Sequence, residues 1–357
     1  MKILIISTGG TISHEPDQNG ILKSDETSHS GSDFVRILNY KKQRVGIESI
    51  NAVTILNKDS ANMGMGDWGA IVDAVHKNYD LYDGFLVTHG TETMGYATAA
   101  ASFALGNLGK PVCFTGSQSA FGVMGSDSIL NLENCLRVLT ERRDLVGVFL
   151  VFGTQIVSGS RVKKQTEFDY DAFKCPRRFR PLGVIGSDIM YNEPEIQRHL
   201  SSIKPFAKTS SELKVINKFE DKIVVLTEFP GLRSDVIIEL AKSGIKGFVL
   251  RSYGSGVPNV GREDATFPSL RPAFKYLQEQ KIPLVITSQA HTGVACMNIY
   301  EPSFLARELG AIPARDTTIE AAVAKLSWLL GQGKNYTQVS NLMQKNMRGG
   351  MMEVKCQ

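Results

Sequence analysis

Two threonines, a glutamate and a lysine in this sequence carry side chains that are able to do nucleophilic chemistry together. Thr11 and Thr91 each follow a short apolar run, Glu92 stands beside Thr91, and Lys164 lies on a distant segment. A threonine hydroxyl is a weak nucleophile near neutral pH, so each needs an activating neighbour. A lysine beside a carboxylate and a hydroxyl relays protons when its pKa is shifted. Hydrolysis of an amide needs such a set: a nucleophile, a base for its proton and an acid for the leaving ammonia.

The segment that positions Thr91 and Glu92 reads as a strand, a polar turn and a helix. Residues 84–88 form a short apolar run bounded by turn formers, which is typical of a buried parallel strand. Small and periodic apolar residues from Met94 to Leu105 predict a helix packed closely on its sheet. Open α/β sheets bind their ligands at such strand ends. The alternative is that residues 91–93 are an ordinary helix N-cap with an acid in the first turn.

Two further segments repeat this pattern. The apolar run 2–6 is followed by Ser7-Thr8-Gly9-Gly10-Thr11, and residues 111–118 read Pro-Val-Cys-Phe-Thr-Gly-Ser-Gln. Paired glycines let the backbone turn tightly and approach a ligand. We therefore expect three strand ends of one sheet to bring hydroxyls, a carboxylate and glycines together.

These strings resemble the bacterial-type L-asparaginase/glutaminase family. TGGTI, HGTETM and KPVCFTGSQ carry the resemblance, and DSANMGMGDW, GSDSILNLENCL and SRVKKQTEFDYDAF extend it in the same order. LRSYGSGVPN, TIEAAVAKLSWLL and KNMRGGM look most like the cytoplasmic, type I branch. The resemblance covers nearly the whole chain, and its order and spacing make it specific.

The resemblance implies conversion of L-asparagine to L-aspartate and ammonia. It implies that Thr11 is the primary nucleophile and that Thr91, Lys164 and Glu92 form a threonine–lysine–acid triad. It also implies a set of substrate-binding residues, comprising Gly10, Asp59, Ser60, Thr91, Glu92 and Ser117. In the family, Ser60 matches the residue that holds the α-carboxylate, and Ser117 lies where the side-chain amide is held. For these two serines, the alternative is that they make only ordinary turn hydrogen bonds. For Lys164, the alternative is that Lys163 matches the family's lysine, which would follow from a shift of one residue in the alignment.

The sequence departs from the family around the substrate's α-ammonium. The family has aspartate at the position of Glu92, glutamine or serine at that of Ala61, and a lid tyrosine where Ile21 stands. Separately, type I enzymes have a cysteine at the position of Ala290. Because this chain lacks that cysteine, the allosteric asparagine site of type I enzymes is in doubt here. We expect an L-asparaginase with a modified ammonium clamp. The alternatives are the same chemistry on an α-amine-modified asparagine or another amide, and a catalytically weak binding homologue.

Composition adds limits on partners and location. The net charge of +4 is spread over 357 residues and does not call for nucleic acid. The five cysteines are scattered, which argues against a disulfide framework or a zinc cluster and suits a reducing compartment. No leader precedes the first strand and no apolar run approaches a membrane span, so we expect a cytoplasmic protein without membrane contact. We expect no metal or cofactor, and by resemblance a homodimer or homotetramer.

The fold class predicted from the alternation of strands and helices is α/β, with two domains and mainly parallel sheets. The larger N-terminal catalytic domain spans residues 1–188, a polar segment with two prolines at 189–217 reads as a linker, and the smaller C-terminal domain spans residues 218–357. Residues 13–33 read as a polar loop placed to act as a lid. By resemblance, Asp127 matches a family acid near the active-site helix, but we expect it to be the N-cap of a helix that starts near Ile129. His89 reads as structural.

Overall fold

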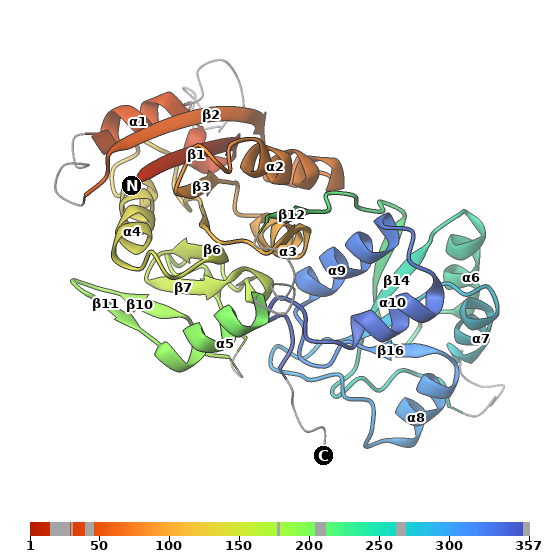
Figure 1. Cartoon of the computed structure of the whole chain (residues 1–357). Coiled ribbons are helices and arrows are strands. Elements are labelled where there is room, and N and C mark those ends of the chain that lie inside the picture. The colour runs from red at the N-terminus through yellow and green to blue at the C-terminus, as the bar shows by residue number, and fades with distance from the viewer. Residues whose placement is uncertain are drawn as a thin grey trace. The chain divides into compact units, whose positions relative to one another are not determined.

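The computed structural model describes residues 1–14, 29, 31–39, 46–176, 179–203, 212–261 and 269–352. The chain divides into two compact units, Met1–Asn217 and Lys218–Gln357 (Figure 1). Each unit is built on its own sheet flanked by helices, which confirms the predicted α/β class with two domains and mainly parallel sheets. Most of the predicted lid, with its residue Ile21, lies outside the described residues.

The first unit contains an eight-stranded sheet in the order β11-β10-β7-β6-β5-β3-β1-β2. The neighbouring strands from β6 to β2 pair in parallel, and β7, β10 and β11 pair antiparallel at the other edge. The strand bounds are β1 Lys2–Gly9, β2 Ser49–Lys58, β3 Gly84–Thr88, β5 Pro111–Thr115, β6 Gly147–Phe152, β7 Gln155–Ser158, β10 Gly183–Ile185 and β11 Ile189–Tyr191. Two short pairs complete the unit, β4 Leu105–Gly106 with β12 Lys214–Val215, and β8 Lys163–Lys164 with β9 Phe173–Lys174.

Burial on both faces explains why the central strands are continuous apolar runs. Ile3 and Ile5 of β1 pack in one cluster with α1 (Gly31–Asn39) and α4 (Ser128–Glu141), while Leu4 and Ile6 are buried on the opposite face. Between β3 and β5 in the sequence, α3 (Met94–Ala104) is almost entirely buried. Its alanines and glycine are small enough for close approach to the sheet. The remaining helices of this unit are α2 (Met65–Lys77) and α5 (Glu193–Ile203).

The segment predicted as a linker, residues 189–217, is instead largely structured as part of the first unit. It contains β11, α5 and β12. Pro194 is the second residue of α5, where proline is tolerated because a backbone N–H at that position would have no intrahelical acceptor. Ile196, His199 and Ile203 form the buried face of this helix. The polar residues of this segment that lie in α5 therefore form the exposed face of a helix and not a connection between domains.

The second unit is built on a four-stranded, fully parallel sheet in the order β13-β14-β15-β16. Its strands are β13 Ile223–Thr227, β14 Gly247–Ser252, β15 Leu284–Ser288 and β16 Ala311–Pro313. Its helices are α6 Ser234–Lys242, α7 Arg271–Glu279, α8 Glu301–Glu308, α9 Ile319–Gly331 and α10 Tyr336–Met343. Phe248, Phe274 and Ile286 lie at the centre of its apolar core.

The cysteines differ from the sequence prediction in one respect. Cys113, Cys135 and Cys175 are free thiols, but Cys296 is disulfide-bonded. Spacing along the chain gave no sign of this bond, because a disulfide depends on proximity in the folded chain. Within the described ranges, every helix is too short or too polar to span a bilayer.

Candidate active site

The ends of β1, β2 and β3 are held together by contacts between their backbones. A methyl group on Gly10 would lie 2.3 Å from Cα of Gly90, and one on Gly90 would lie 2.5 Å from Oγ of Ser60. Gly10 also has φ +85°, a conformation that favours glycine, and its N–H donates to the carbonyl of Lys58. Glycines at these positions therefore let the three turns approach closely. The residues that follow Gly10 and Gly90 are Thr11 and Thr91.

Thr11 begins a single 3₁₀ turn, η1 (Thr11–Ser13), directly after the end of β1. Its carbonyl accepts a hydrogen bond from the His14 N–H, whereas its hydroxyl makes none with the residues that the structure describes. The side chain is only partly buried. Among the described residues, the hydroxyl that the resemblance assigns as the nucleophile therefore has no hydrogen-bond partner.

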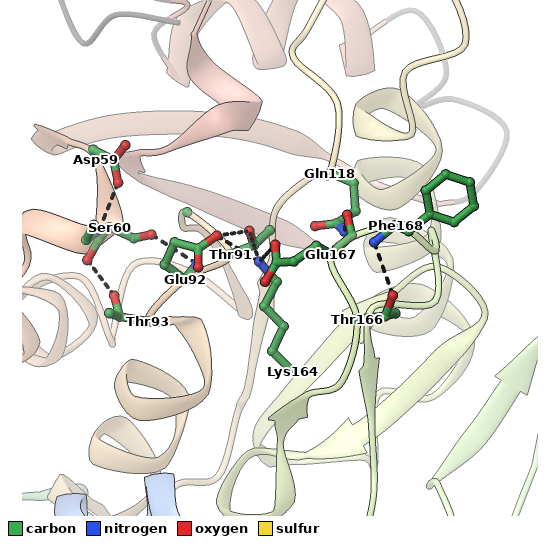
Figure 2. A network of polar contacts seen from close by, with 12 residues as sticks. Asp59, Ser60, Thr91, Glu92, Thr93, Gln118, Lys164, Thr166, Glu167 and Phe168 are labelled. Carbon is green, nitrogen blue, oxygen red and sulfur yellow. Dashed lines mark hydrogen bonds and ion pairs between the residues drawn. The ribbon is translucent and has the colours of Figure 1, made fainter. Parts of the chain in front are cut away.

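Lys164 connects the turn after β3 to a distant segment, as Figure 2 shows. Its Nζ donates to Oγ1 of Thr91 at 3.0 Å and to Oε1 of Glu92 at 2.8 Å. The Thr91 hydroxyl in turn donates to the same Glu92 oxygen at 3.4 Å. Thr91 is buried, while the side chain of Glu92 is about half exposed. The structure therefore brings these three predicted residues into one hydrogen-bonded group, with Lys164 rather than Lys163 in the contact.

A hairpin carries Lys164 to this position. Lys164 of β8 pairs with Phe173 of β9, and the loop that joins these strands is bonded just before β9 to the turn that follows β6. Asp171 accepts hydrogen bonds there from the backbone N–H and the hydroxyl of Thr154. Because β6 is parallel to β3, its carboxyl end lies at the same edge of the sheet as Thr91.

Sequence reasoning missed Glu167, which is also bound to Lys164. Oε2 of Glu167 accepts from the Lys164 Nζ at 2.7 Å, and the backbone carbonyl of Glu167 accepts from the side chain of Gln118. In the sequence, Glu167 follows Lys164 by three residues, which is the spacing of many ordinary surface ion pairs. That spacing was the only signal available from the sequence. Lys164 thus lies between two carboxylates, and this group of three carries a net negative charge.

Asp59 and Ser60 form the side of the site next to Glu92. Asp59 caps η3 (Ser60–Asn62) by accepting from the backbone N–H of Ala61. The Ser60 hydroxyl accepts from the N–H of Glu92 at 3.1 Å, and the Ser60 carbonyl accepts from the hydroxyl of Thr93. The end of β2 is therefore attached to the turn that carries Glu92.

The turn after β5 supplies Ser117, whose hydroxyl donates to the carbonyl of Ser119 at 2.7 Å. Asp127 is the N-cap residue of α4, as predicted, but its carboxylate makes no capping hydrogen bond. It accepts instead from the backbone N–H groups of Gln118 and Ser119 and from the side chain of Asn131. Asp127 occupies the N-cap position, but its charge organises the neighbouring turn.

His89 is buried, and burial lowers its pKa to about 4, so the ring is neutral near pH 7. Its Nδ1 lies 2.8 Å from the Gly90 carbonyl, which requires the proton on Nδ1. This hydrogen bond is to the backbone and does not involve the hydroxyls of Thr11 or Thr91. Within the described ranges, no cluster of three or more His, Cys, Asp or Glu residues is arranged to hold a metal ion.

Comparisons with known proteins agree over both units. Residues 2–197 match the family model described as Asparaginase, N-terminal, and residues 222–343 match that of the Glutaminase/Asparaginase C-terminal domain. The chain is 31% identical over 348 residues to L-asparaginase 1 of Escherichia coli, covering 98% of this chain and 97% of that protein.

Two further comparisons indicate how wide the similarity extends. The solved structure of the thermostable L-asparaginase from Thermococcus kodakarensis aligns with a TM-score of 0.84 at 29% identity, covering 99% of this chain and 100% of that one. A component of the glutamyl-tRNA(Gln) amidotransferase of Aeropyrum pernix is 31% identical over 362 residues, covering 99% of this chain and 80% of that protein.

Proposed function

This chain belongs to the asparaginase family of amidohydrolases, and we propose that it hydrolyses L-asparagine to L-aspartate and ammonia with Thr11 as the nucleophile. The observation that carries the proposal is the contact of the Lys164 Nζ with both Thr91 and Glu92. Thr91 and Glu92 of this group stand on the turn that packs against Gly10, the residue before Thr11. In this proposal, the nucleophile Thr11 follows β1 and the relay residue Thr91 follows the neighbouring strand β3.

In the first half of the proposed reaction, Oγ of Thr11 attacks the side-chain carbonyl carbon of asparagine. The hydroxyl proton passes to the amide nitrogen, the C–N bond breaks, and ammonia leaves an acyl-threonine ester. The backbone N–H of Thr91 has no acceptor among the described residues and is available to the developing oxyanion. Removing one such donor typically costs ~10²–10³ in rate.

In the second half, water hydrolyses the ester. The Thr91–Lys164 pair takes a proton from the attacking water, and the other proton returns to Oγ of Thr11 as the C–O bond breaks. Aspartate is released as its carboxylate, so each turnover sends one proton of the water to solvent or to ammonia. All bonds in this scheme are made and broken by side chains and water.

The hydrogen bonds already made by the binding residues suit their proposed roles. Ser60 Oγ accepts from the Glu92 N–H and keeps its own proton, which it donates to the substrate's α-carboxylate. Ser117 donates its proton to Ser119 and keeps lone pairs, which accept from the substrate's amide N–H. Glu92 binds the α-ammonium, and Gly10 and Asp59 shape the backbone around the substrate.

A second candidate is the same reaction on an α-amine-modified asparagine or another amide. The observation that favours it is Ala61, which presents no polar group beside Ser60, together with the longer Glu92 in place of aspartate. A relative named as part of a glutamyl-tRNA(Gln) amidotransferase indicates that this fold accepts more than one amide.

We also propose that the protein assembles as a homodimer or homotetramer. Met124 and Phe168 of the first unit have exposed fractions of 100% and 92%, and an assembly would remove such apolar side chains from water. Light scattering tests this, and a fully active monomer would refute it.

The function is tested by replacing the Thr11 hydroxyl with a methyl group and measuring ammonia release. Thr11→Val should lower kcat on asparagine by about 10³-fold or more while leaving the fold intact. Thr140→Val is the matched control, because the Thr140 hydroxyl only bonds to carbonyls of its own helix. Turnover of Thr11→Val near that of the control would mean that Thr11 is not the nucleophile. Assays with asparagine, glutamine and N-acetyl-asparagine separate the substrates, and binding without ammonia release would identify a weak binding homologue.

A further inference from the structure

Glu167 accepts a hydrogen bond from Lys164 at 2.7 Å and extends the Thr91–Lys164 pair to the surface. We propose that Glu167 is the last residue of the proton relay and passes the proton from Lys164 to solvent. This inference rests on the proposed function, in which Thr91 and Lys164 take a proton from water.

The hydrogen bonds of Lys164 provide the first support. An ammonium group has three N–H donors, and those of Lys164 are directed at Thr91, Glu92 and Glu167. With every N–H engaged, including the one that donates to Thr91, Lys164 accepts a proton from Thr91 only after it gives one up and turns the freed lone pair toward Thr91. A carboxylate in hydrogen-bond contact is the acceptor that such a transfer needs.

Exposure gives the relay a direction. Thr91 is 6% exposed and the Lys164 side chain 14%, whereas the Glu167 side chain is 74% exposed. A proton on Thr91 has little direct access to bulk water, but a proton on Glu167 exchanges with it freely. Glu92 is the other carboxylate on Lys164, but in the proposed function it binds the substrate's α-ammonium. Bound substrate would cover Glu92 and leave Glu167 in water.

Hydrogen bonds hold the loop on both sides of Glu167 (Figure 2). Gln118 donates to the Glu167 backbone carbonyl at 2.8 Å, and Thr166 accepts from the N–H of Phe168 at 3.1 Å. An exposed ion pair contributes little to stability and does not require such an arrangement. Fixing the backbone keeps the carboxylate within reach of Lys164.

The proposed transfer balances in protons. Lys164 first gives one proton to Glu167 and turns the freed lone pair of Nζ toward Thr91, whose hydroxyl turns from Glu92 to Lys164. The attacking water then gives a proton to Oγ1 of Thr91 as the Thr91 hydroxyl proton moves to Lys164 Nζ. Glu167 then releases its proton to water and returns to a carboxylate. The proton that leaves is the one lost when the aspartate product ionises.

The test compares Glu167→Gln, which keeps the shape and an acceptor oxygen, with Glu167→Ala, which leaves space for a small acid. Both should lower kcat by about 10²-fold with KM little changed, which is the lower end of typical acid–base contributions. Added formate should restore kcat of Glu167→Ala in proportion to its concentration and should not affect the wild type. Asp169→Asn is the control, because it removes an exposed acid from the same loop.

Wild-type kcat in Glu167→Gln would overturn the inference, since the carboxylate would then be a surface ion pair only. A loss of kcat that formate does not reverse would also overturn it and would leave Glu167 as a positioning residue. If the wild type releases no ammonia from any amide, the proposed function itself falls.

Discussion

Gly10 and Gly90 touch through their backbones, with the Gly90 Cα only 2.3 Å from the position that a side chain on Gly10 would occupy. Gly90 is equally confined on its other side by Ser60. This contact brings Thr11, Thr91 and Ser60 to one place although they are far apart in the sequence.

Gly90→Ala should therefore disturb the site directly. Its new methyl group would lie 2.7 Å from Cβ of Ser60, so Ser60 must move at a cost of ~1–3 kcal/mol in unfolding free energy. KM for asparagine should rise because Ser60 holds the α-carboxylate in the proposed function. Gly66→Ala, whose methyl group would meet nothing within 4 Å, is the control and should be neutral or stabilising. If Gly90→Ala and Gly66→Ala change the unfolding free energy and KM equally, the close contact between Gly90 and Ser60 does not determine the geometry of the site.

Thr91→Val and Lys164→Met test whether the two residues act as one unit. Each should lower kcat by about 10³-fold, and the double variant should lose little more, because members of a catalytic unit are not additive. Steady-state kinetics on the four proteins measure this. If the loss of kcat in the double variant equals the product of the two single losses, the 3.0 Å contact between Thr91 and Lys164 has no part in the reaction.

The substrate is tested by restoring the family residues with Glu92→Asp and Ala61→Ser. If free asparagine is the substrate, the pair should raise kcat/KM for asparagine by more than the two single changes predict, since neighbouring positions couple by ~0.5–3 kcal/mol. If the natural substrate lacks a free ammonium, the double variant should have a higher kcat/KM for asparagine and a lower kcat/KM for N-acetyl-asparagine than the wild type. An unchanged rate on every amide would remove both residues from substrate choice.

Asp127 is expected to act on the turn after β5 and not as a helix cap. Asp127→Ser keeps a good capping residue but removes the acceptor for the N–H groups of Gln118 and Ser119, at a cost of ~1–3 kcal/mol. The free energy of unfolding in urea and kcat/KM should both fall. Stability equal to that of the wild type would restore the capping interpretation.

Lys325 of α9 makes the stability of the second unit depend on pH. It is 3% exposed, its Nζ donates to the carbonyls of Met343 and Lys345, and burial lowers its pKa to about 7. The unfolded chain, with a lysine pKa of about 10.4, binds more protons than the folded chain between these values. Folding is therefore favoured as pH rises from about 7 toward 10, by up to ~1.4 kcal/mol per pH unit.

Urea unfolding at about pH 7.5 and about pH 9, both inside this window, measures the dependence. The wild type should gain stability relative to Lys325→Met over that interval. A parallel pH dependence in the two proteins would contradict a lowered pKa at Lys325.

Local patterns predicted the elements well where burial decides them. The apolar run at 84–88 is β3 with the same bounds, because each of its residues is buried and a polar residue follows at once. The helix expected from Ile129 is α4, which begins at Ser128. Such elements depend on periodicity, which is a property of the sequence itself.

The parts that the sequence did not predict depend on contacts between distant segments. Glu167 acquires its place from a hairpin that returns to the carboxyl end of β6, and the Asp127 carboxylate binds the N–H groups of a loop instead of its own helix. The alignment of Lys164 with Thr91 was available only through the family resemblance. Tertiary contacts of this kind leave no periodic signal along the chain.

The glycine contacts between the turns also decide which positions evolution is able to change. A side chain at Gly9, Gly10, Gly90 or Gly116 would strike backbone or a buried neighbour within 2.6 Å. A side chain at any of these positions therefore disturbs the backbone of the site together with its chemistry. Side chains that stand outside these contacts, such as those at positions 61 and 92, are free to change the substrate while the scaffold stays the same.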